Sequence, residues 1–171
     1  LKEPVTESTK KAARCFYALN QNRADKKRYP AVDPIDSYSK YLDYPEIVQY
    51  MSEHIAPDWV EKVLKAKNIV LRGKEAYEQI NILGDDGVPI SYHEIYWKSE
   101  LIDFVILQQD AFDKIDASCP IERQKYMLAL VLEACDAKYE FDTFEECSTY
   151  YKGLINIFKQ MNYSEFKSAE F

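Results

Sequence analysis

The chain has 171 residues, 47% of them apolar, and a formal charge of -7 from 29 acidic and 22 basic side chains. This apolar content is enough for a folded core and excludes a disordered or fibrous chain. The negative charge repels polyanions, so we do not expect nucleic acid as a partner. No apolar run approaches the roughly 20 residues that cross a bilayer, and residues 1–30 lack a secretory signal, so we expect a cytoplasmic protein without direct membrane insertion.

Composition predicts a mainly α fold. The chain holds only four glycines, and long stretches are dominated by residues that favour helix over strand by intrinsic preference: Leu, Ala, Glu, Lys and Gln. The first residue is leucine rather than methionine, and "LKEPVTES" reads like the interior of a longer sequence. We therefore expect a fragment of a larger protein.

The first segment, residues 1–35, is predicted to contain one short strand, a short helix and a stiff arm. The run "RCFYAL" at about 14–19 is the only credible strand, and we expect it to pair with a sheet outside this chain. Residues 21–28 suit one or two helical turns. Pro30 and Pro34 then fix two φ angles, so Tyr29 stands at the head of an arm that loses little entropy on binding.

Residues 36–171 are predicted to form one helical bundle. Pro45 begins one helix and Pro57 a second, which should end near Gly84, a favourable C-terminal stop. The stretch "GDDGVPIS", residues 84–91, cannot continue a helix and predicts a turn between antiparallel helices.

Three further helices follow that turn. Ser91 is the expected N-cap of a helix over about 92–112, with Glu94 completing a capping box. Another helix should begin near Pro120, and the last should be capped by Asp142 or Thr143. The 92–112 helix should turn a set of apolar side chains inward: Ile95, Leu101, Ile102, Val105 and Ile106.

The sequence carries no complete catalytic or metal-binding motif. It contains no G-x-x-x-x-G-K-S/T, G-x-G-x-x-G, G-x-S-x-G or H-E-x-x-H pattern, and its acidic pairs are typical of solvated helix ends and turns. The four cysteines lie far apart and away from both histidines, so we expect free thiols rather than a zinc site, with Cys135 buried on an apolar helical face. We name no catalytic residue and no metal ligand.

Four motifs, in order, resemble one protein family. "RYPAVDPIDS" is similar to the segment after the last strand of the nucleotide-binding domain in rotary ATPase catalytic subunits. "EPVTESTKKAARCFYALN", "INILGDD" and "ILQQDAFDKID" resemble the catalytic A (alpha) subunit of V/A-type ATPases. Two departures, "PAVDPIDS" in place of "PAINW" and a turn without the carboxylate run of F-type enzymes, suggest a divergent bacterial member.

The resemblance implies that this chain contributes to an adenine pocket. In the family, the aromatic residue at the position of Tyr29 stacks on the adenine of ATP, and the phenylalanine at the position of Phe112 closes the same pocket. Ile106 is a third candidate for its lining. The alternative for Tyr29 is packing on Pro30, and for Phe112 it is simple core packing.

The resemblance also implies partners and cofactors. Residues 1–35 would end the nucleotide-binding domain, and 36–171 would be the C-terminal helical bundle. The turn Gly84, Asp85, Asp86, Gly87, Val88 and Pro89 would face the rotor. The full subunit would bind ATP or ADP with Mg, alternate with B subunits in a hexamer, contact the central and peripheral stalks, and drive proton or sodium transport from the cytoplasmic face of the membrane. The fragment alone, without the phosphate loop, should bind no cofactor and be inactive. Two alternatives remain open, a stand-alone helical interaction module without nucleotide binding and the β subunit of an F-type enzyme.

Overall fold

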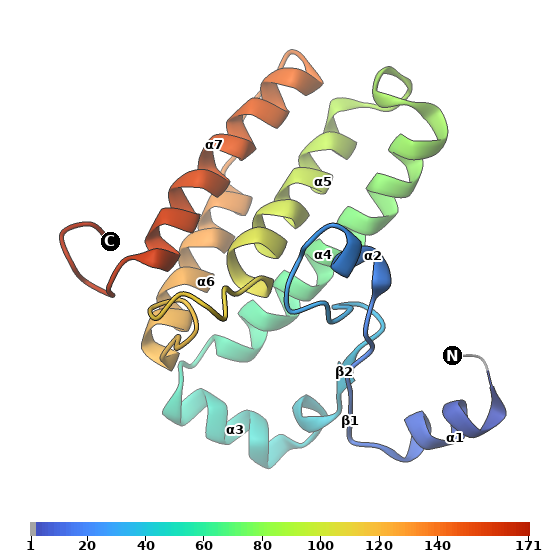
Figure 1. Cartoon of the computed structure of the whole chain (residues 1–171), viewed down its shortest axis with the longest axis vertical. Helices are drawn as coiled ribbons and strands as arrows, with labels where there is room; N and C mark the ends of the chain where they lie inside the picture. The colour runs from blue at the N-terminus through green and yellow to red at the C-terminus, as the bar shows by residue number, and fades with distance from the viewer. Residues whose placement is uncertain (1–2) are drawn as a thin grey trace.

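A computed structural model describes residues 3–171. Within them, seven α-helices and one two-stranded sheet are present, which confirms a mainly α fold (Figure 1). The helices are α1 Pro4–Ala12, α2 Gln21–Asp25, α3 Pro45–His54, α4 Trp59–Leu83, α5 Ile90–Ile102, α6 Ile121–Asp136 and α7 Phe144–Tyr163. Short segments complete the chain: β1 Cys15–Phe16, β2 Tyr38–Ser39, η1 Tyr41–Asp43, η2 Asp85–Gly87 and η3 Asp103–Leu107.

Helices α4, α5, α6 and α7 pack as a bundle, with α1, β1, β2 and α3 beside one end of it (Figure 1). Apart from Arg123 of α6, the side chains with almost no exposed surface are apolar or aromatic, come from α5, α6 and α7, and show where the core lies: Leu101, Ile102, Val131, Cys147 and Tyr151. Cys135 is buried in the same cluster, and all four cysteines are free. Burial raises the pKa of the Cys135 thiol to about 12, so this cysteine behaves as a small apolar side chain.

Helices α4 and α5 form the antiparallel hairpin that the turn signals predict. Gly84 ends α4 with φ of +80°, a conformation that glycine adopts without strain, and its N–H donates to Ile80 O at 2.8 Å. The 3-10 segment η2 and Pro89 then lead into α5. The hairpin tip lies at the opposite end of α5 from the arm that contains Tyr29 (Figure 1).

Three details of the sequence interpretation need correction. The strand at 14–19 is not the only one, because Cys15 and Phe16 pair antiparallel with Ser39 and Tyr38 of this same chain. Ser91 is not the N-cap of α5, which begins at Ile90 after Pro89 and has no side-chain cap. Proline suits this place, because its fixed φ fits a helix start and it has no N–H to satisfy.

The predicted helix over 92–112 is too long. Helix α5 ends at Ile102, the π-helical segment η3 follows, and the helical conformation ends at Gln108, whose backbone is extended. The N–H of Gln108 donates to Asp103 O at 3.0 Å, which closes the wide π turn. Because Asp103 is also held by ion pairs from outside the helix, tertiary contacts override a local preference for continued helix here. Helix α1 was not predicted.

Candidate functional site

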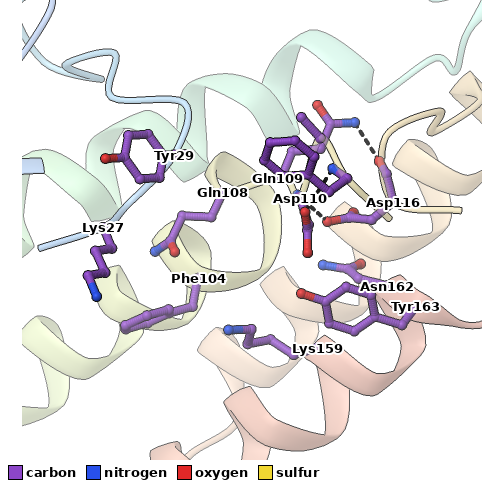
Figure 2. A pocket seen from close by; sticks show the side chains of 12 residues that line it. Lys27, Tyr29, Phe104, Gln108, Gln109, Asp110, Asp116, Lys159, Asn162 and Tyr163 are labelled. Carbon is purple, nitrogen blue, oxygen red and sulfur yellow. Dashed lines mark hydrogen bonds between the residues drawn. The ribbon is translucent and has the colours of Figure 1, made fainter. Parts of the chain in front are cut away.

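A cavity of about 540 Å³ lies between the arm, η3 with the loop that follows it, and the end of α7. Tyr29 stands on one side of it, Phe104 and Lys159 lie below, and Asn162 and Tyr163 lie on the other side (Figure 2). The full lining is Lys27, Tyr29, Phe104, Gln108, Gln109, Asp110, Ala111, Phe112, Asp116, Lys159, Asn162 and Tyr163. The site is therefore built from three segments that are distant in sequence.

Tyr29 is held by its backbone while its ring remains accessible. Its carbonyl oxygen accepts a hydrogen bond from the N–H of Gln109 at 2.9 Å, which joins the arm to the loop after η3. The hydroxyl makes a long contact of 3.4 Å with Ala24 O, and the residue is 54% exposed. The peptide bond between Tyr29 and Pro30 is cis. Tyr29 thus presents an aromatic face to the cavity rather than to the core.

Phe112 lines the same cavity and is 99% exposed. This exposure contradicts the alternative of core packing. Its N–H donates to Asp110 Oδ1 at 2.9 Å, and the N–H of Asp110 donates to Asp116 Oδ2 at 2.6 Å. Gln109 Nε2 donates to Asp116 O at 2.6 Å, so the loop that presents Phe112 is fixed by hydrogen bonds (Figure 2). A fully exposed phenylalanine on a fixed loop is suited to contact a flat ligand.

Ile106 does not line this cavity. It is half-buried on η3 and lines a neighbouring cavity of about 210 Å³, together with Trp59, Met127 and other residues. Gln108 and Asn162 line both cavities, so the two spaces adjoin. Of the three predicted pocket residues, the structure brings together Tyr29 and Phe112.

Several cavity residues were not singled out from the sequence. Gln108 belongs to the quoted "ILQQDAF" motif, and its buried Nε2 has no hydrogen-bond partner among the described residues. Lys159 and Asn162 come from α7, where nothing in the local sequence marks them. Asn162 Nδ2 donates to Val105 O at 2.8 Å, which places the end of α7 against η3. A buried amide donor without a partner is unfavourable, and an acceptor that reached it would satisfy it.

Two arginines and two carboxylates meet beneath the arm. Arg28 Nη2 lies 2.7 Å from Glu100 Oε2, Arg28 Nη1 lies 2.5 Å from Asp103 Oδ2, and Arg23 Nη2 lies 2.8 Å from Asp103 Oδ1. The hydrogen bond to Glu100 and the negative charges of Glu100 and Asp103 raise the pKa of the Arg28 guanidinium, although burial acts to lower it. The sequence analysis did not identify this cluster, because its members come from two distant segments.

The predicted rotor-facing turn lies at the far end of the α4–α5 hairpin. Gly84, Asp85, Asp86, Gly87 and Pro89 are exposed, and Val88 is half-buried. The buried His93 donates from Nε2 to Asp85 O at 2.9 Å, since a carbonyl can only accept, and its ring stacks on Phe144 at 5.2 Å between centroids. The turn is thus anchored to α5 and α7.

No group of three or more His, Cys, Asp or Glu side chains that could hold a metal ion occurs in residues 3–171. The residues described here therefore do not fit a magnesium site by themselves. Over the same residues, no helix is both long enough and apolar enough to span a bilayer.

The helical bundle, with its arm and cavity, matches a known class of protein domain. A family model for the C-terminal domain of V and A type ATP synthase matches residues 48–146, and the chain belongs to this family. This confirms the resemblance drawn from the motifs.

Curated relatives extend the likeness to the arm. The V-type ATP synthase alpha chain of Chlamydia abortus is 38% identical over 169 residues, and that of Protochlamydia amoebophila is 35% identical over 169 residues. Each match covers 99% of this chain and 28% of the relative, so the chain spans little more than a quarter of the length of these proteins.

A solved structure shares the fold. The ATP synthase subunit NeqB from Nanoarcheaum equitans matches with a TM-score of 0.55 and 19% identity, over 78% of this chain and 31% of that one. At this identity the likeness concerns the fold alone.

Proposed function

We propose that this chain forms the adenine-binding wall and the rotor-coupling end of the catalytic A subunit of a V/A-type ATP synthase. The observation that supports this most strongly is the meeting of Tyr29 and Phe112 at one cavity, from segments that the family resemblance had assigned to the same base. Two accessible aromatic faces beside a cavity of this size suit a purine ring, because stacking needs flat area with few rotamers to order.

The polar lining gives the base a donor as well as a surface. The amide Nε2 of Gln108 is buried and unpaired among the described residues, and adenine offers ring nitrogens as acceptors. Lys27 and Lys159 add positive charge to the lining, and Asp110 and Asp116 add negative charge, so both signs are present at the cavity. Gln108 would therefore orient the base between the two aromatic residues.

The chemistry belongs to the whole subunit. ATP or ADP would bind with Mg, whose ligands and the phosphate loop would lie in the part of the subunit outside this chain, where phosphoryl transfer takes place. The subunit would alternate with B subunits and contact the central and peripheral stalks, and the complex would couple ATP hydrolysis or synthesis to proton or sodium transport. The isolated chain should hydrolyse no ATP.

The test is steady-state ATP hydrolysis by the assembled complex carrying Tyr29→Ala. Base–aromatic stacking contributes about 1–3 kcal/mol, and about 1.4 kcal/mol corresponds to a tenfold change, so we expect KM for ATP to rise roughly tenfold or more. Tyr29→Phe keeps the ring and should behave like the unsubstituted complex.

Tyr50→Ala is the matched control, because Tyr50 is 59% exposed and does not line the cavity. It should leave KM unchanged. A KM within twofold of the unsubstituted value for Tyr29→Ala would contradict the proposal.

A further inference from the structure

The residue immediately before Tyr29 makes the densest set of ionic contacts in the described chain. Arg28 binds Glu100 through both terminal guanidinium nitrogens, with Nη1 to Oε1 at 2.9 Å and Nη2 to Oε2 at 2.7 Å. The same Nη1 also donates to Asp103 Oδ2 at 2.5 Å. This fork geometry fixes the direction of the guanidinium as well as its distance.

The cluster is shielded from water. The side chains of Arg28, Glu100 and Asp103 are 17%, 12% and 7% exposed, and Arg23 at 11% supplies a second positive charge to Asp103. Two positive and two negative groups therefore balance one another. Removing one partner would leave a buried charge uncompensated, which is far more disruptive than losing a surface ion pair.

The cluster also touches the cavity wall. The Arg28 guanidinium lies 4.7 Å from the centre of the Phe104 ring, and Phe104 lines the cavity. On the following residue, the Tyr29 carbonyl accepts from Gln109 N–H at 2.9 Å. Two successive residues of the arm are thus bound to the end of α5 and to the loop after η3, one through its side chain and the other through its backbone.

We propose that Arg28 is a positioning residue, which holds the Tyr29 ring at the cavity by fixing the arm to Glu100 and Asp103 at the end of α5. The inference rests on the proposed function, because it concerns the same base site. A buried ion pair often stabilises a fold no more than apolar residues of equal volume would, so its contribution here is the placement of the arm. Within residues 3–171, the hydrogen bonds of Tyr29 are the one that its carbonyl accepts and the long one from its hydroxyl.

The experiment compares ATP with UTP in the assembled complex carrying Arg28→Gln. A misplaced Tyr29 ring weakens stacking most for the larger purine base. We expect KM for ATP to rise roughly tenfold, KM for UTP to change less than threefold, and kcat at saturation to stay within about threefold. Arg28→Lys keeps the charge but not the fork, and should give an intermediate KM for ATP.

Two further variants keep the test decisive. Glu100→Gln is a milder change, because Arg28 stays paired with Asp103, and it replaces Arg28→Gln if that variant does not assemble. For Glu100→Gln, KM for ATP should rise about threefold and KM for UTP should not change. Lys65→Gln is the matched control, because it removes an exposed ion pair of 2.6 Å to Asp136, and neither residue lines the cavity. It should change neither KM.

The outcomes separate the inference from the function on which it rests. Equal changes of KM for both nucleotides, or none for ATP, in Arg28→Gln or Glu100→Gln would overturn the positioning role, because a merely structural effect does not distinguish the bases. Tyr29→Ala serves as the reference. The preference for ATP is the ratio of KM for UTP to KM for ATP. If Tyr29→Ala abolishes this preference while Arg28→Gln retains it, the positioning role alone fails. If Tyr29→Ala retains the preference, the proposed base contact fails as well.

Discussion

Asp116 is the residue at which charge and burial oppose each other most directly in the site. It is 8% exposed, and burial raises the pKa of its carboxyl, although the hydrogen bond from Asp110 N–H and the charge of Arg123 act in the opposite direction. The pKa of Asp116 is higher in the folded state than in the unfolded state. Its protonated form therefore contributes fully to stability below the ordinary pKa of 3.8, and this contribution is lost as the pH rises through the pKa of the folded state.

Asp116→Asn removes that charge and retains an oxygen to accept from Asp110. We expect its Tm at about pH 7 to exceed that of the unsubstituted chain by a few degrees, since about 1 kcal/mol corresponds to roughly 2–4 °C in a chain of this size. The difference should disappear at about pH 3, where Asp116 is protonated. Thermal unfolding of both chains at the two pH values checks this, and a lower Tm for the variant at about pH 7 would contradict it.

The sequence could predict the aromatic members of the site but not the polar ones. Tyr29 and Phe112 stand in motifs that a family resemblance can assign. Gln108 and Asp116 stand in the same quoted motif as Phe112, but the resemblance assigned them no role, and Lys159 reaches the site only because the end of α7 meets the loop after η3. Ile106, the third candidate, lies on η3 and lines the smaller cavity that adjoins this one.

At the level of elements, α4 and α5 approach each other as closely as glycine allows. A Cβ added to Gly73 would lie 2.0 Å from Ser99 Cβ and 2.4 Å from Ser99 Oγ, distances at which the helices must separate. This close packing makes the α4–α5 hairpin rigid. A rigid hairpin is needed if a movement at the cavity is to be transmitted to the turn.

Gly73→Ala should therefore lower the free energy of unfolding by about 1–3 kcal/mol, because overpacking outweighs the gain in helix propensity. Gly153→Ala on α7 is the matched control. Its added Cβ meets nothing within 4 Å, so the same change should stabilise the chain by up to about 1 kcal/mol. Urea unfolding measures both, and equal stability of the two variants would show that the α4–α5 contact can relax.

Helix starts and stops were predictable where the signal is a backbone property. Pro45 begins α3, Gly84 ends α4, and Thr143 caps α7 by accepting from Glu146 N–H at 3.2 Å, as expected. The end of α5 was not predictable, because it depends on ion pairs of Asp103 with Arg23 of α2 and with Arg28. Strand β2 was missed for a different reason: it is only two residues long, and so short a strand leaves no recognisable sequence pattern.

At the scale of the molecule, the exposed turn of the α4–α5 hairpin lies at one end of α5 (Figure 1), and η3, which follows the other end of α5, contributes Phe104 to the cavity lining. Such an arrangement suits coupling, since a rigid hairpin anchored at both ends moves as one body. The His93 contacts to Asp85 O and Phe144 provide the anchor at the turn.

Replacing Asp85 and Asp86 by asparagine tests that coupling in the assembled complex. We expect affinity for the central stalk to fall by about threefold to tenfold, with a matching loss of ATP-driven rotation, because exposed charge contacts contribute about 1 kcal/mol or less each. The control replaces Glu75 and Glu78, exposed residues of α4, by glutamine with the same change in charge. Unchanged rotation and stalk affinity in the Asp85/Asp86 variant would exclude these side chains from the contact.

The most direct test of the account is an experimental structure of the assembled complex with ADP and Mg bound. The account predicts that the adenine ring occupies the cavity between the Tyr29 and Phe112 rings, with Gln108 Nε2 within hydrogen-bond distance of a ring nitrogen. A nucleotide bound to the same subunit with its base outside this cavity, and with both rings free, would contradict it.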